Sequence, residues 1–143
     1  MEESSRPVEI SQGTRKVMEA LADTIIPGGD DGRPGALDMD LVDRFLEFLG
    51  QFPPAPRWFA VFCWMWEFCP LWSGRLVRFS GLSFEERTRI LESWENSRFF
   101  FRRGALIIFK SIFLATFYNN REVWPLLGYK EGCLSEPPNP IED

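Results

Sequence analysis

Apolar residues recur along the first third of the chain with the spacing of amphipathic helices. From Ser11 to Ile26 the apolar positions fall on one helical face, with charged residues between them. The segment 27–35 holds four glycines and two prolines and is predicted to be a loop. A second helix is predicted from Asp38 or Asp40, whose carboxylates can accept hydrogen bonds from first-turn amides. It should end at Gly50, before the prolines that follow.

Two later segments are apolar on nearly every side. Over residues 57–69 periodicity alone does not separate a buried helix from a strand, but the length and the helical neighbours favour a helix. Its aromatic stretch, Trp58 to Phe68, is more typical of core than of a site. The segment from Arg98 or Phe99 to Tyr118 is also predicted to be helical. A helix of that kind is central in its domain or covered by another chain.

The clearest start of a helix is the sequence Ser83-Phe84-Glu85-Glu86, which has the pattern of a capping box. It predicts a helix from there to about Ser97. Five helices with short connections, and no competing strand pattern, predict an all-α fold, a compact single-domain bundle. We expect a flexible N-terminus over residues 1–10, the helical domain over 11–130 and an irregular C-terminal tail over 131–143.

Composition changes this picture mainly through the aromatic residues. The 143 residues include 14 Phe and 6 Trp, more large rings than a small interior readily holds, so part of them is expected in an interface. The net charge of −5 argues against nucleic acid as a partner. The longest apolar stretch, Ala105 to Tyr118, is interrupted by Lys110 and is too short to span a bilayer.

The residues needed for common catalytic and metal sites are missing from the sequence. The chain has no histidine and no glycine-rich nucleotide motif. The acidic loop at Asp30 lacks the spacing of a calcium loop, and the spacing of Cys63 and Cys69 fits neither zinc nor iron–sulfur sites. Both cysteines are expected to be buried and structural, whereas Cys133 could be a surface thiol. We therefore predict no catalytic, cofactor-binding or metal-binding residue in this chain; catalysis through carboxylates or Cys133 is the disfavoured alternative.

The three cysteines, an odd number, also bear on location. They are most simply interpreted as reduced thiols, and the first residues contain no apolar segment of a secretory signal. Both observations predict a cytoplasmic protein.

Two clusters are candidates for binding a partner. Arg98, Arg102 and Arg103 surround three phenylalanines, and the four-residue spacing of Arg98 and Arg102 would place them on one helical face. The cluster fits a contact with an acidic partner or anionic lipid, and equally a solvated helix start whose arginine stems cover apolar surface. The second cluster is a turn after the last helix, in which Gly128 should have a positive φ. The candidate partner-binding residues are Arg98, Phe99, Arg102, Arg103, Trp124 and Tyr129.

Several of these segments resemble a known family. The sequence Leu21-Ala22-Asp23-Thr24-Ile25-Ile26-Pro27, followed by a Gly/Asp loop and Pro34-Gly35-Ala36, resembles the small subunit (subunit 3) of gluconate 2-dehydrogenase. The stretch from Leu82 through Trp94, Ser97 and Lys110, with the closing Trp124-Pro125-Leu126-Leu127-Gly128-Tyr129, is similar to the helical segment that precedes the flavin domain of long-chain alcohol oxidases. The resemblance covers about residues 14–130.

The resemblance implies a non-catalytic subunit. Its partner would be an FAD-containing large subunit of the glucose–methanol–choline (GMC) oxidoreductase family, which oxidises an alcohol or sugar and passes electrons to a cytochrome or another acceptor. The export signal of secreted relatives is missing here, which weakens an export role. The alternative is a peripheral, lipid-contacting helical adaptor, because aromatic helices lie beside the arginine cluster.

Overall fold

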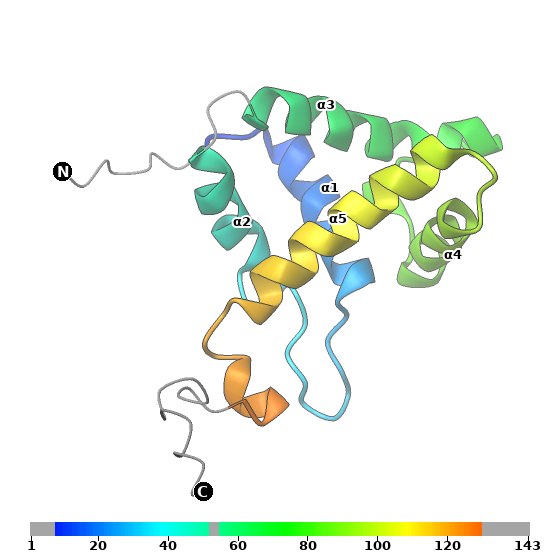
Figure 1. The fold of residues 1–143 in the computed structure, drawn as a ribbon. Coiled ribbons are helices and arrows are strands. Elements are labelled where there is room, and N and C mark those ends of the chain that lie inside the picture. The colour runs from blue at the N-terminus through cyan, green and yellow to red at the C-terminus, as the bar shows by residue number, and fades with distance from the viewer. Residues whose placement is uncertain (1–7, 52–54, 130–143) are drawn as a thin grey trace, which may run out of the picture.

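The computed structural model describes residues 8–51 and 55–129, and within them the chain is helical without any strand (Figure 1). The helices are α1 (Gln12–Ile25), α2 (Leu41–Gly50), α3 (Ala55–Phe68), α4 (Phe84–Glu95) and α5 (Phe100–Tyr118). Three 3₁₀ helices join them: η1 (Cys69–Ser73), η2 (Phe79–Gly81) and η3 (Trp124–Leu127). The predicted all-α, single-domain fold is thus confirmed. The predicted C-terminal tail and most of the flexible N-terminus lie outside the described residues.

Helix α1 is the centre of the bundle. Its N-terminus is capped by Ser11, whose hydroxyl oxygen accepts a hydrogen bond from the amide of Thr14 at 3.1 Å. The helix buries Val17, Met18 and Leu21, and all four other α-helices and η2 pack against it. In Figure 1, α2 and α4 flank α1, α3 crosses above it and α5 passes in front.

An aromatic core joins α3 to α5. The ring of Phe109 on α5 lies 5.4–5.9 Å from those of Phe62 and Trp66 on α3 and of Phe113 on its own helix. Trp66 in turn stacks on Trp94 of α4, with 4.2 Å between the ring centroids. These contacts hold α3, α4 and α5 against one another, because offset and edge-to-face rings add to the free energy of apolar burial.

The local sequence predicted the capping of α4 correctly and that of α2 incorrectly. The capping box of α4 forms as predicted, with the Ser83 hydroxyl accepting from the Glu86 amide and the Glu86 carboxylate accepting from the Ser83 amide. The predicted carboxylate cap of α2 is wrong. Asp40 has a left-handed backbone with φ 48° and makes no side-chain cap, while Asp38 accepts from the Gly35 amide at 2.8 Å. The nearby loop, not the helix, therefore uses that carboxylate.

A single arginine ties α4 to the C-terminal end of α1. Arg87 donates to the carbonyl oxygen of Ala20 at 3.3 Å and to the carboxylate of Asp23 at 2.8 Å, and its side chain is only 13% exposed. The last turn of α1 has no basic residue of its own. A cation at this position also interacts favourably with the negative end of the helix dipole.

Replacing Phe109 by alanine should destabilise the fold by about 3–5 kcal/mol, because it leaves a cavity in the aromatic core. Phe100 on the same helix is the matched control, since its ring is 81% exposed and its loss should change the free energy of unfolding by less than about 0.5 kcal/mol. Urea unfolding followed by circular dichroism measures both. Equal losses for the two variants would show that α5 is not oriented as described.

Replacing Arg87 by alanine should cost about 1.5–3 kcal/mol, the range for hydrogen bonds between charged groups. Arg89, two positions further along α4 and exposed, provides the control, and Arg89→Ala should be nearly neutral. The same urea titration compares the two variants, and a neutral Arg87→Ala would refute the link between α1 and α4.

Candidate interaction surface

Helix α5 has one buried and one exposed side. The buried side carries Ala105, Leu106, Phe109, Phe113 and Phe117. The opposite side, here called the α5 outer face, consists of seven exposed and uncharged residues: Phe100, Phe101, Ile107, Ile108, Ser111, Ala115 and Tyr118. Such a face is unusual on a monomer, where exposed helix positions normally carry charged side chains.

Helix α3 adds a second exposed apolar surface. Trp58 is 75% exposed and Trp64 65% exposed, with Val61 between them on the same side. Only part of the aromatic stretch therefore lies in the core, where Cys63 and Trp66 are fully buried. The sequence favoured a core role for the whole stretch, and this is wrong for the two exposed tryptophans. The helix is apolar on all sides, so its pattern did not show which side faces outwards.

The three arginines of the predicted cluster differ in their surroundings. Arg98 precedes the helix, since Phe99 is the N-cap residue of α5, so Arg98 and Arg102 do not share a helical face as predicted. The guanidinium of Arg102 lies 5.7 Å from the ring of Trp94 and 5.5 Å from that of Phe99. Arg103 is exposed and is turned about 100° around α5 from Arg102. It lies beside the α5 outer face, where a partner can contact it.

The predicted turn after α5 is well defined. Gly128 has φ 70°, as expected, and the Tyr129 amide donates to the Trp124 carbonyl at 2.9 Å. The indole nitrogen of Trp124 donates to the Tyr118 carbonyl at 2.8 Å, and the rings of Trp124 and Tyr129 lie 5.2 Å apart. Leu127 and the rings of Tyr118, Trp124 and Tyr129 line a shallow hollow of about 540 Å³. The turn thus extends the apolar surface beyond the end of α5.

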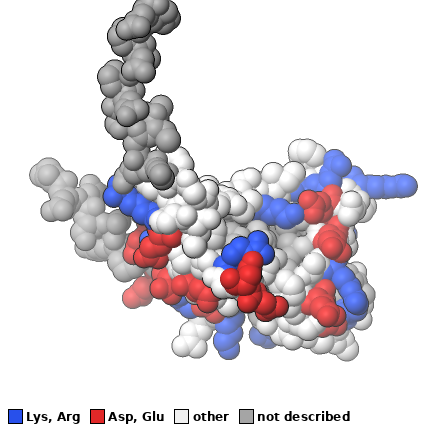
Figure 2. All heavy atoms as spheres, turned by 90° about the horizontal axis from the view of Figure 1, so that it is seen from below, with Lys and Arg blue, Asp and Glu red and all other residues white. Residues whose placement is uncertain are grey.

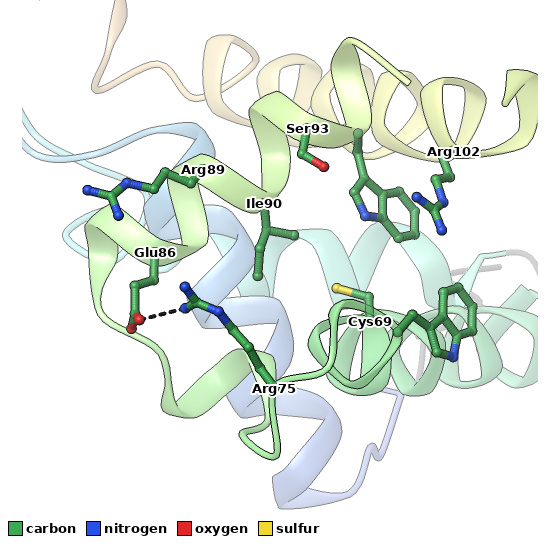
Figure 3. A pocket seen from close by; sticks show the side chains of 9 residues that line it. Cys69, Arg75, Glu86, Arg89, Ile90, Ser93 and Arg102 are labelled. Atoms are coloured by element: carbon green, nitrogen blue, oxygen red, sulfur yellow. Dashed lines mark hydrogen bonds and ion pairs between the residues drawn. The ribbon is translucent and has the colours of Figure 1, made fainter. Parts of the chain in front are cut away.

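A small pocket of about 170 Å³ lies where α4, η1 and the start of α5 meet (Figure 3). Arg75 and Glu86 point towards each other and form an ion pair of 2.7 Å, while Arg89 and Arg102 lie on opposite sides. The Ser83 amide and Arg75 hold the pKa of Glu86 below its usual range. Cys69 also lines the pocket, but burial raises the pKa of its thiol to about 12. The Cys69 thiol is therefore not poised as a nucleophile at neutral pH.

Charged residues gather on other parts of the surface. Figure 2 shows carboxylates and cations interleaved over one face of the molecule. Ion pairs connect Arg15 of α1 with Asp43 of α2 at 2.7 Å, and Arg44 of α2 with Glu122 at 3.8 Å. In contrast, Lys110 is the only charged residue between Gly104 and Asn120. The charge distribution separates a solvated side of the bundle from the α5 outer face.

The two described thiols should be inert in the folded chain. Burial raises the pKa of Cys63 and of Cys69 to about 12, so neither forms thiolate at neutral pH. In a Cys133→Ser variant, an aromatic disulfide reagent at pH 8 should titrate no thiol until urea is added, and two thiols afterwards. Rapid reaction without urea would show that the helices open locally around these cysteines.

Within residues 8–51 and 55–129, no three histidine, cysteine or acidic residues come together as a metal site would require. None of the described helices combines the length and apolar character that crossing a bilayer needs. The chain matches no protein-family model, no curated protein and no solved structure. The exposed apolar surface and the sequence motifs are therefore the observations that bear on its function.

Proposed function

We propose that this chain is a non-catalytic subunit that binds and stabilises the FAD-containing catalytic subunit of a GMC-type alcohol or sugar oxidoreductase. The observation that carries the binding role is the α5 outer face, an exposed helix side without a charged residue. Its large side chains, with those on α3, could bury an area on the order of the ~800 Å² that one partner gives to a standard interface. The nature of the partner comes from the sequence resemblance.

The residues that carry the resemblance have structural roles in this fold. Leu21 and Ala22 are buried in α1, Ser83 and Glu86 form the cap of α4, and the turn at Gly128 closes the end of α5. The resemblance therefore bears on the fold and the surface of this chain, and it assigns no catalytic residue to it. In the proposed complex FAD belongs to the large subunit, and a cytochrome or another acceptor takes the electrons.

A second candidate is a lipid-contacting adaptor, favoured by the exposed Trp58 and Trp64 on α3 and by the exposed Arg98 and Arg103 at the start of α5. Tryptophan and arginine are typical of helices that lie in the membrane interface. However, the net charge of −5 opposes approach to an anionic bilayer. A protein partner is therefore the preferred proposal.

A pull-down of the tagged chain from its native host tests the proposed complex. The wild-type eluate should be yellow, show a flavin absorption spectrum and contain a GMC-type large subunit by mass spectrometry. The variant Ile108→Glu should recover at least about tenfold less flavoprotein, because it places an unpaired charge in the interface. The variant Leu76→Glu is the control, since Leu76 is 95% exposed in the connection between η1 and η2.

A colourless eluate containing the chain alone would contradict the proposed complex. Flotation with vesicles of anionic phospholipid then decides the second candidate. Binding that is lost in a Trp58→Ser, Trp64→Ser double variant would establish lipid contact, whereas absence of binding would remove it.

A further inference from the structure

A regular line of residues along the exposed side of α5 matches the spacing of a coiled-coil seam. Counting from Phe100, the spacing 4-3-4-3-4 selects six positions: Phe100, Gly104, Ile107, Ser111, Leu114 and Tyr118. This spacing is the heptad repeat, which keeps one stripe of a helix facing a partner helix. Phe100, Ile107, Ser111 and Tyr118 are exposed, and the other two positions are half-buried. We call this line the α5 seam.

The packing of this chain alone does not explain why residue 104 is a glycine. Glycine weakens the interior of a helix, and a Cβ atom added at Gly104 would meet nothing within 4 Å beyond its chain neighbours and the adjacent backbone of its own helix. Nothing within the described residues therefore requires a glycine there. Glycine does allow another backbone to come close, and Ser111 one heptad further on is also small. Both positions fit the approach of a second helix along the α5 seam.

The two flanks of the seam differ in character. One flank is formed by Phe101, Ile108 and Ala115, and Ala115 also lines a mainly apolar groove of about 700 Å³ between α2 and α5. The other flank carries Arg103 and Lys110. Lys110 is already paired with Glu95 at 3.0 Å, whereas Arg103 pairs with no carboxylate in the described part of the chain. The charge that a partner would meet beside the seam is thus that of Arg103.

Positive charge accumulates at the start of α5 without an internal counterpart. No side chain caps the helix, its first turn has no acidic residue, and no aspartate or glutamate occurs between Asn96 and Arg121. The free amides of the first turn add the positive end of the helix dipole to Arg98 and Arg103. This end of the seam therefore favours carboxylates from outside the chain.

We propose that the α5 seam binds an amphipathic α-helix of the partner protein, with carboxylates at the end of that helix that lies against Arg98 and Arg103. The proposal deepens the proposed function and rests on it only in assigning the helix to the partner subunit. A second copy of this chain fits less well, because its own α5 would bring Arg103 and no carboxylate. Charge complementarity thus selects an acidic helix over self-association.

Two synthetic peptides test the proposal directly. Both are about three heptads long, with leucine at the seam-facing positions and glutamine elsewhere. One carries three glutamates at one end, and the other carries three lysines at the same positions. Fluorescence anisotropy of the labelled, dilute peptides against the full chain should show binding of the glutamate peptide, and at least about tenfold weaker binding of the lysine peptide.

Variants of the chain identify the surface used. Ile107→Glu should weaken binding of the glutamate peptide at least about tenfold, since Ile107 is 61% exposed and central in the seam. Gly104→Gln should weaken it as well while favouring the free helix, so its loss of binding is not a loss of folding. Arg103→Glu should reverse the preference between the two peptides. Leu76→Glu is the matched control and should bind like wild type.

Two peptide results would overturn the proposal: failure of both peptides to bind, and binding that survives Ile107→Glu. If neither peptide binds and light scattering shows a dimer that Ile107→Glu dissociates, the seam belongs to a second copy. Peptide binding without a flavoprotein in the pull-down would refute the proposed function and leave the seam standing. If the pull-down recovers a flavoprotein in an amount that Ile107→Glu does not change, the result would support the proposed function and refute the α5 seam as the binding site.

Discussion

The contact of Phe109 with the aromatic rings of α3 is the interaction on which the arrangement of this bundle depends. Phe109, Phe113 and Phe117 follow one another at four-residue spacing, so a helix that buries the first buries all three. Their burial against α1, α2 and α3 fixes the rotation of α5 about its own axis. Once that rotation is fixed, the opposite stripe from Phe100 to Tyr118 must face outwards. The exposed face is therefore a consequence of core packing, and its uncharged composition is what requires a further explanation.

The distribution of charged residues is consistent with the interface that we propose for the α5 outer face. The ion pairs of Arg15 with Asp43, of Arg87 with Asp23 and of Arg44 with Glu122 join α1 to α2 and α4, and α2 to the segment after α5. They leave α5 with Arg102, Arg103 and Lys110, of which Arg102 lies over the ring of Trp94. A surface of this kind supplies apolar area for affinity and one cationic end for orientation, which is the usual division between the core and the charged rim of an interface.

The two described thiols and the Glu86 carboxylate have structural roles. Both described thiols are buried with raised pKa values, and Glu86 serves the cap of α4 and the ion pair with Arg75. The segments on which the sequence resemblance rests likewise cap, pack or turn the chain. In the complex that we propose, this chain would bind through the α5 outer face, and the flavin chemistry would lie with its partner.

The sequence by itself determined the helices and their ends wherever the deciding interaction is local. The capping box at Ser83 and the turn at Gly128 involve residues within five positions of each other, so their patterns predicted the observed geometry. Tertiary structure decided the rest, because it depends on contacts between distant segments. Arg102 turns towards Trp94 of α4, and Trp58 and Trp64 face outwards while Trp66 is buried. A helix that is apolar on every side carries no signal for which side is covered, so only packing could select its exposed face.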